Sequence, residues 1–332
     1  MNERKRIWIP EAPYINLKRY IEVDRLDHGV GIEGWFTVEL IHARTGLVKR
    51  RLRFRNLITN AGLNALGSGT TINNLIQYLA VGTGSNTPSF TDTALQAEIA
   101  RTNSNGGFAD VDTANGSGDT LVYWSRVRTR VFTESQANGN LAELGFFNQA
   151  TGGTLWNRQL FLDELGNPTV ITKTNEDQLR VQYEYRIYPP MADNVQNIVI
   201  NGVDTSVTSR PMQVANTAVW GSTGLMTSLG STAITPQSWV SETATLLGRN
   251  GGIQGTPAGS TAYQAYTPGT FYREAQTTFG PSQANFATGV QYHAISLLGG
   301  CQYQMVFSPK IQKTNTQRLE IMHRITFNRV TI

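Results

Sequence analysis

The sequence predicts a mainly β protein, with two tandem, internally duplicated antiparallel β-sandwich domains, few short helices and an extended N-terminal arm. The prediction rests on composition, on alternation of apolar and polar residues, and on an internal repeat. The 332 residues include 32 Gly, and 16% are charged, against about 25% in ordinary soluble proteins. Such a composition favours turns and short strands over long helices.

The internal repeat indicates a tandem duplication. In the first pair of segments, Arg, Phe, Ser, Gln, Ala and Asn recur at the same spacing, and in the second pair Lys, Thr, Asn and Leu do so. The paired segments are 126–138 with 273–285, 173–179 with 313–319 and, more weakly, 62–68 with 224–231. Because the matches occur in the same order in both halves, duplication explains them better than chance.

The strands are predicted from period-two alternation, which is clearest at the end of each copy, over 179–187 and 319–327. Other strands are expected, in chain order, at Trp35–Ile41, Leu47–Leu57, Ile76–Val81, Leu121–Phe132, Leu141–Phe147, Leu155–Leu162 and Ile295–Phe307. Two helices are expected, at Ala61–Leu66 and at Thr93–Ala100, where Asp92 can cap the first turn.

The domain boundary is expected at Pro189-Pro190, which punctuates the chain after the first copy. We expect a first β-sandwich domain over residues 31–190 and a second, with long Gly/Ser/Thr-rich loops, over 191–332. Residues 1–30 are basic and aromatic and too short to bury themselves, so we expect an extended docking arm there. Its deletion is expected to leave both domains folded.

The composition also excludes several classes of protein. No stretch approaches the roughly 18 to 20 apolar residues that cross a bilayer, and no apolar segment follows the basic start, so membrane insertion and classical secretion are excluded. The single cysteine, Cys301, cannot form an internal disulfide. We therefore expect a fold held by packing and hydrogen bonds and formed in a reducing cytoplasm.

Basic residues are densest over Lys49–Arg55. Read as a strand, this segment places its arginines on one face and Leu52 and Phe54 on the other. The face is interpreted as solvated or as a guarded sheet edge, with an acidic protein partner as the alternative and nucleic acid disfavoured for lack of a recognition motif. The candidate partner-binding residues are Arg51, Arg53 and Arg55, and in the arm Arg4, Lys5, Arg6, Trp8, Ile9 and Tyr14.

Catalytic and metal-binding motifs are scarce. The sequence contains no G-x-S-x-G, no phosphate-binding G-x-x-x-x-G-K-[ST] and no H-E-x-x-H. The run Asp110–Asp119 departs from a calcium loop at its fifth, sixth and twelfth positions. His323 stands at the repeat position of Tyr183, which indicates a core histidine. We therefore expect no enzymatic activity, no cofactor and no metal.

Several motifs resemble a module of tail and appendage proteins of tailed bacteriophages. They are Asn56–Leu63, Tyr78–Gly84, Asp92–Ile99, Glu143–Phe147, Leu155–Arg158, Gln178–Tyr183 and Phe307–Thr314. The resemblance implies a virion structural protein, such as a tail, collar or fibre-attachment component, and brings no enzymatic residues with it.

From the resemblance we expect a structural protein that assembles as a homo-oligomer, a trimer or a sixfold-related ring. It would bind other tail, collar or fibre proteins in the virion, after assembly in the host cytoplasm and away from membranes. The alternative is a receptor- or glycan-binding tail appendage. In that case loop aromatics could stack on sugars, unless they are buried anchors of their loops: Trp220, Trp239, Tyr263 and Tyr266.

Overall fold

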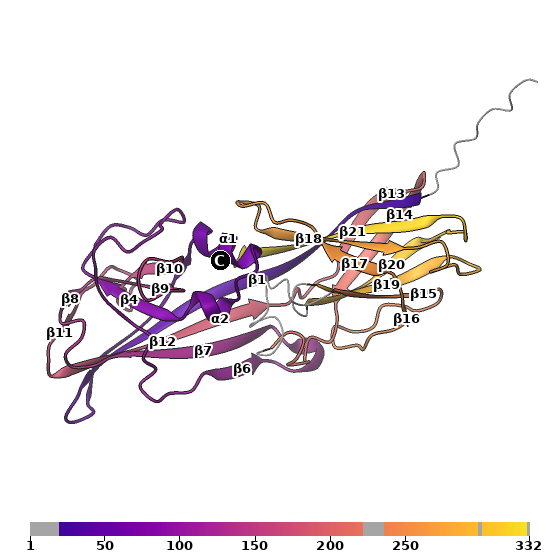
Figure 1. The fold of residues 1–332 in the computed structure, drawn as a ribbon. Coiled ribbons are helices and arrows are strands. Elements are labelled where there is room, and N and C mark those ends of the chain that lie inside the picture. The colour runs from indigo at the N-terminus through magenta and orange to yellow at the C-terminus, as the bar shows by residue number, and fades with distance from the viewer. Residues whose placement is uncertain (1–19, 222–235, 298–300, 331–332) are drawn as a thin grey trace, which may run out of the picture.

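A computed structural model describes residues 20–221, 236–297 and 301–330, and it shows an elongated molecule built almost entirely of strands (Figure 1). The described residues form strands β1 to β21, two α-helices, α1 (Asn60–Gly67) and α2 (Ile72–Leu75), and one 3-10 turn at Gly118–Thr120. The mainly β class expected from composition and alternation is confirmed. None of the helices in these ranges is long and apolar enough to span a membrane.

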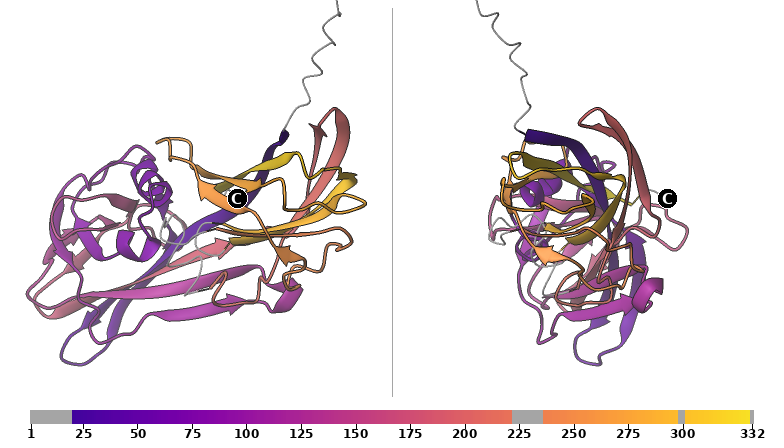
Figure 2. Two further views of the ribbon diagram at one scale, coloured as in Figure 1. Left: turned by 45° about the vertical axis from the view of Figure 1, so that its right-hand side comes forward. Right: turned by 90° about the vertical axis from the view of Figure 1, so that its right-hand side faces the viewer.

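One long strand, β1 (Tyr20–His42), runs through both ends of the molecule (Figures 1 and 2). Residues 20–32 pair in parallel with β21 (Arg318–Arg329), whereas residues 31–42 pair antiparallel with β12 (Asp177–Tyr188). A further strand, β2 (Val48–Arg55), pairs with residues 35–41. β1 thus belongs to two parts of one sheet.

That sheet has eight strands in the order β17-β18-β21-β1-β12-β7-β6, with β2 paired to β1 off this path. The remaining members are β17 (Ser260–Tyr263), β18 (Tyr272–Phe279), β7 (Tyr123–Phe132) and β6 (Val111–Asn115). Two further sheets cover its inner face, one over each end.

A five-stranded sheet covers the end formed by β12, β7 and residues 31–42. Its order is β3 (Leu57–Ile58), β10 (Leu155–Leu160), β9 (Glu143–Phe147), β4 (Tyr78–Gly82) and β5 (Glu98–Thr102). The ring of Phe146 lies 6.1 Å from that of Phe36 and 5.1 Å from that of Tyr183, so the layers pack face to face. A small ribbon of β8 (Gly139–Leu141) and β11 (Ile171–Lys173) lies beside them.

A six-stranded sheet covers the other end. Its order is β13 (Asn194–Ile200), β14 (Val203–Pro211), β20 (Cys301–Ile311), β19 (Val290–Leu297), β15 (Gln237–Ser241) and β16 (Thr256–Pro257). The ring of His293 on β19 lies 5.7 Å from that of Phe279 on β18, and Tyr303 on β20 stacks on His28 of β1 at 4.4 Å. Each end of the molecule is therefore a two-layer β structure.

The structure corrects the expected arm. Residues 20–30 form the first part of β1, and their apolar side chains are buried, for example Ile21 (1% exposed) and Leu26 (0%). They pair with the last long strand of the chain, so they belong to the C-terminal end and not to a separate arm over residues 1–30. Residues 1–19 lie outside the described residues. β1 pairs with strands on both sides of the boundary expected at residues 190 and 191, namely β12 and β21, so it contributes to both ends.

The expected helix over 93–100 is also wrong, because this segment forms a loop followed by β5. Leu95 is buried but Ile99 is 45% exposed, so the two do not share a buried face. The backbone N–H groups of Gln96 and Ala97 are taken by the Glu143 carboxylate instead of a helical turn. The expected helix at 61–66 is confirmed as α1, whose first turn is capped by Thr59.

The first prediction concerns truncation. A chain that begins at Tyr20 should fold like the full chain. A chain that begins at Gly31 loses a buried strand with four apolar core side chains, Ile21, Val23, Leu26 and Val30, and each costs about 1.5–3 kcal/mol of burial free energy. We expect this shorter chain to lose the cooperative unfolding transition of its C-terminal end. Circular dichroism melting of the two truncations checks this, and equal melting curves would contradict the role given to residues 20–30.

Candidate partner-binding face

The three candidate arginines of β2 lie on one face of the strand, as the alternation of residues predicted. Leu52 and Phe54 are buried, 5% and 4% exposed, while the side chains of Arg51 and Arg53 are 65% and 50% exposed on the opposite face. Arg55, whose side chain is 27% exposed, continues the row. The outer face of the eight-stranded sheet therefore presents these side chains to solvent.

Each of these arginines has a glutamate partner: those of Arg51 and Arg55 lie on the adjacent strand β1, and that of Arg53 lies on β12, on the far side of β1. Arg51 lies 3.6 Å from Glu39, Arg53 lies 2.9 Å from Glu184, and Arg55 lies 2.6 Å from Glu33. Two arginines of β12 extend the pattern, Arg180 to Glu39 at 2.5 Å and Arg186 to Glu184 at 2.8 Å. We call these five arginines and three glutamates the arginine–glutamate ladder.

Trp35 of β1 lies at the centre of the ladder. The guanidinium carbons of Arg53, Arg55 and Arg186 lie 5.3, 5.6 and 5.5 Å from its ring, a cation–π geometry. Its indole N–H donates to Glu33 at 2.6 Å, and the hydroxyl of Tyr188 donates to the same carboxylate. Trp35 was not among the sequence candidates. Its position among charged residues on one face of a predicted strand could have indicated that it belongs to this face.

The exposed arginines of the ladder, Arg51 and Arg53, are suited to contact an acidic partner. Five arginines face three glutamates, which leaves positive charge on this face. Exposed ion pairs contribute only about 0–1 kcal/mol each, so a partner carboxylate can replace one at little cost. Arg51 and Arg53 are the exposed members, whereas Arg55 is held by Glu33 beside Trp35.

A hollow of about 330 Å³ adjoins the ladder, lined by Glu33, Arg55, Phe90 and Arg329 among others. Arg329 donates to the carbonyl of Ile58 at 2.7 Å and to the side chain of Asn60 at 2.6 Å. Its guanidinium lies 4.2 Å from the centre of the Phe90 ring. The last long strand is thereby tied to the start of α1, which strengthens the join between the two ends.

The other sequence candidates are distributed differently. The candidate arm residues Arg4, Lys5, Arg6, Trp8, Ile9 and Tyr14 lie outside the described residues. Trp220 is fully buried and donates to the carbonyl of Met212, and Tyr266 donates to Asn64 of α1. These two are anchors, while Trp239 and Tyr263 are half-buried.

The acidic run examined for calcium is neutralised by arginine. Asp110 and Asp112 form ion pairs of 2.6 and 2.7 Å with Arg128 and Arg126 of β7. Within the described ranges, no group of three or more His, Cys, Asp or Glu side chains is arranged to hold a metal ion.

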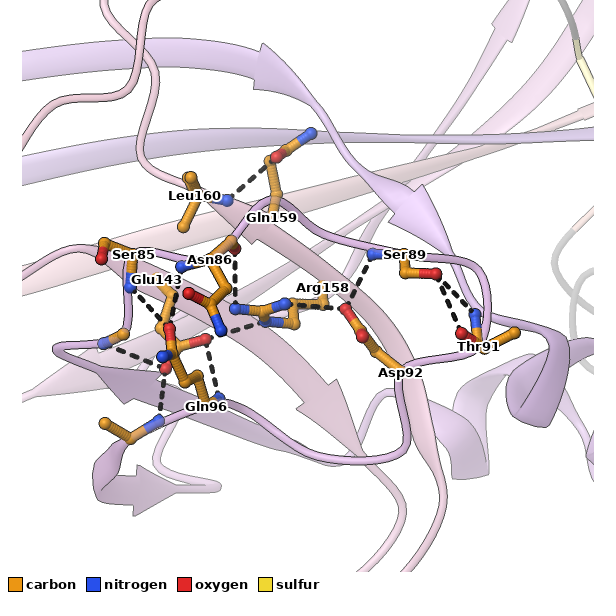
Figure 3. A network of polar contacts seen from close by, with 12 residues as sticks. Ser85, Asn86, Ser89, Thr91, Asp92, Gln96, Glu143, Arg158, Gln159 and Leu160 are labelled. Carbon is orange, nitrogen blue, oxygen red and sulfur yellow. Dashed lines mark hydrogen bonds and ion pairs between the residues drawn. The ribbon is translucent and has the colours of Figure 1, made fainter.

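A buried polar network holds the loop between β4 and β5 (Figure 3). Arg158 of β10, 3% exposed, lies between Glu143 at 2.8 Å and Asp92 at 2.7 Å. Glu143, 0% exposed, also accepts hydrogen bonds from the backbone N–H groups of Gly84, Gln96 and Ala97. Through these bonds Glu143 positions the loop between β4 and β5.

Three of the four histidines form a buried chain between the layers of the C-terminal end. His293 Nε2 lies 3.1 Å from His323 Nε2, and His323 Nδ1 lies 3.4 Å from His28 Nε2. The other nitrogen of His293 faces the carbonyl of Trp239 at 3.1 Å, and because a carbonyl only accepts, this nitrogen carries the proton.

This proton on His293 fixes the donors of the other two hydrogen bonds, which all point in the same direction along the three histidines. His323 donates to His293, His28 donates to His323, and His28 Nδ1 is left without a partner among the described residues. All three rings are neutral in this arrangement. Burial lowers the pKa of His28 to about 3 and that of His293 to about 4, and it holds the pKa of His323 well below 6.5.

The second prediction concerns the buried network. Glu143→Gln keeps the shape of the side chain but leaves Arg158 with an incompletely compensated buried charge, which should cost about 3–5 kcal/mol of unfolding free energy. Urea unfolding at neutral pH measures the loss. Asp27→Asn, which removes an exposed ion pair with Arg25, is the control and should cost less than about 1 kcal/mol. Similar losses in both variants would contradict a structural role for the network.

The third prediction concerns pH. A histidine whose folded pKa lies below its unfolded value of about 6.5 loses stability as pH falls from 6.5 towards the folded pKa, by about 1.4 kcal/mol per pH unit. The unfolding free energy should therefore drop steeply below pH 6.5. His323→Tyr, which installs the residue found at the matching position in β12, should show a shallower acid slope in urea unfolding. An unchanged slope would show that the histidine chain does not set the acid stability.

Comparison with protein-family models, with curated proteins and with solved structures finds no match for this chain. No functional residue is therefore carried over from another protein.

Proposed function

We propose that this chain is a non-enzymatic structural component of the tail or collar of a tailed bacteriophage, where it assembles as a homo-oligomer and connects tail parts or attaches fibres. The observation that carries the proposal is β1, which crosses from one β end into the other and hydrogen-bonds in both. A shared strand makes the two ends one stiff unit, as a connector requires. The resemblance of several motifs to phage tail proteins points the same way.

We further propose that the two ends are tandem duplicates of one β-sandwich unit. The strand order β12-β7-β6 at one end corresponds to β21-β18-β17 at the other. The order β3-β10-β9-β4-β5 likewise corresponds to β14-β20-β19-β15-β16. Matching order in both layers supports duplication, since unrelated units would have no reason to share it.

Matching contacts at the repeated segments support the same proposal. Lys173 donates to Asn138 at 2.9 Å, and Lys313 donates to Asn285 at 2.8 Å. Each lysine also donates to the carbonyl of the following threonine. The alanine before each asparagine has a positive φ, 56° and 54°, and Leu179 pairs with Phe132 as Leu319 pairs with Phe279. The echo at 224–231 lies outside the described residues.

Duplication bears on assembly. Three chains with two similar units each present six similar surfaces, which would let a trimeric fibre meet a sixfold tail; a plain ring of identical chains is the other arrangement. The ladder on the outer face is a candidate contact with a neighbouring virion protein. The absence of enzymatic activity is part of the proposal.

A receptor- or glycan-binding appendage is the second candidate function. A hollow of about 480 Å³ lies along β15, β16 and β17, and its lining includes Trp239, Gln237, Ser260 and Gln283. Neutral polar side chains with an aromatic residue are a common lining for sugar sites. A glycan panel with the purified protein and a Trp239→Ala variant would distinguish this role.

The fourth prediction tests the proposed function. Purified particles of a phage that encodes this chain should contain it, and a label fused to its C-terminus should appear at the tail or collar in threefold or sixfold positions. Electron microscopy of labelled particles measures this, with unlabelled particles as the control. Complete particles that lack the chain would contradict the proposal.

A further inference from the structure

The six-stranded sheet ends at β13, whose outer edge pairs with no other strand in the described part of the chain. β13 reads Asn-Val-Gln-Asn-Ile-Val-Ile, with no charge, glycine or proline. Its Val195 and Val199 are 58% and 56% exposed. The side chains of Asn194 and Gln196 hydrogen-bond to the backbone of Asp27 in β1. An uncharged, apolar edge that pairs with no strand is a template for another strand.

The other outer strands are protected. β2 and β5 carry charged residues, and β6 carries an aspartate paired with arginine. The remaining outer strands are short: β17 has four residues, β8 and β11 have three each, and β3 and β16 have two each, one of those in β16 being proline. Charge, shortness and proline are the usual means by which proteins prevent pairing at a sheet edge. β13 has none of these, so its edge is suited to a partner.

The rim of this edge is acidic. Two hollows of about 250 and 560 Å³ lie between β13, β14 and the start of β1, and Glu22, Asp24 and Asp204 line them. None of these three carboxylates has an ion pair within the described ranges, although many other carboxylates of this protein do. Asp24 lines both hollows. The rim therefore favours a basic segment.

The first 19 residues of the chain have the complementary chemistry. They include five Lys or Arg against two Glu, and the apolar run Ile7-Trp8-Ile9 follows Arg4-Lys5-Arg6 directly. They enter the fold at Tyr20, which lines the smaller hollow. Fully extended, 19 residues span at most about 65 Å, enough to reach a neighbouring molecule.

We propose that the edge of β13, with its acidic rim, is the docking site for residues 4–9 of a second copy of this chain, which add along β13 as a further strand. This inference rests on the proposed homo-oligomeric role. Proline fixes φ and extends the residue before it, so Pro10 and Pro13 favour an extended connection between residues 4–9 and Tyr20, which suits reach to a neighbouring molecule. Main-chain hydrogen bonds supply the pairing, and the basic residues meet the three carboxylates.

Crosslinking between singly substituted full-length chains tests the proposal. One chain carries Ile7→Cys and the other Val199→Cys; the native Cys301 is fully buried and does not compete. After mixing and mild oxidation we expect a disulfide-linked dimer that contains one chain of each kind. Val111→Cys, on the edge of β6 and also 56% exposed, is the matched control and should give about tenfold less dimer, since docking raises the local concentration only at β13.

Charge reversal provides the second measurement. Glu22→Lys with Asp24→Lys should reduce the crosslink several-fold, and Arg4→Glu with Arg6→Glu in the partner chain should restore it. Salt of roughly 0.5 M should weaken the native pair because it screens the rim. A crosslink at the level of the Val111→Cys control would overturn the proposal.

Two other outcomes would also overturn it. A dimer formed by Val199→Cys chains alone would mean that β13 pairs with itself. An internal disulfide in one chain that carries both substitutions, without the mixed dimer, would mean docking onto the same chain. Because these experiments use the purified protein, a negative result alongside the chain's presence in particles would reject the docking site and leave the proposed function standing.

Discussion

The rest of the structure depends on one constraint, the change of pairing along β1, which pairs first with β21 and then with β12. Over two residues, Gly31 and Ile32, the strand touches both β21 and β12. A Cβ at Gly31 would lie 2.9 Å from a methyl of Val330, and one at Gly34 would lie 2.2 Å from the Tyr183 hydroxyl. Glycine therefore avoids crowding at the change of partner and, more strictly, three residues after it at Gly34. Both cores close around this crossing, and Arg329 and the hollow beside the ladder lie next to it.

The two ends solve the problem of buried polar groups in different ways. The N-terminal end buries charges and pairs them, as in Arg158 with Glu143 and Asp92. The C-terminal end buries histidines as neutral rings, which donate along the chain from His28 to the Trp239 carbonyl. The first arrangement depends on both charges being present, and the second depends on each imidazole ring carrying one proton and no second one. Neighbouring halves of one body thus respond to different changes in solution.

Local patterns in the sequence predicted the features that depend on neighbouring residues. Alternation gave the strands at 179–187 and 319–327, and the repeated Lys-Thr-Asn motif marked two corners with the same contacts. Partner choice was not predictable, because residues 20–32 pair with a strand almost 300 residues later. The prediction of a helix after Asp92 was wrong because the Asp92 carboxylate, which would have capped it, accepts a hydrogen bond from Arg158. The backbone N–H of Gln96, which would have continued the helix, donates to Glu143. The arginine–glutamate ladder was not predicted, because its ion pairs depend on the register between neighbouring strands. The sequence of a single strand does not reveal that register.

The parallel pairing of residues 20–32 with residues 318–329 also governs the order in which the chain can fold. During synthesis from the N-terminus, the first strand of the C-terminal end emerges early and must wait for the last strand before its core can close. Until then Ile21, Val23 and Leu26 have no sheet to cover them. Contacts this distant in sequence form slowly, because loop closure must precede them. A chain that stops before residue 318 would leave this core open, so the C-terminal end closes only after the whole of β21 has been made.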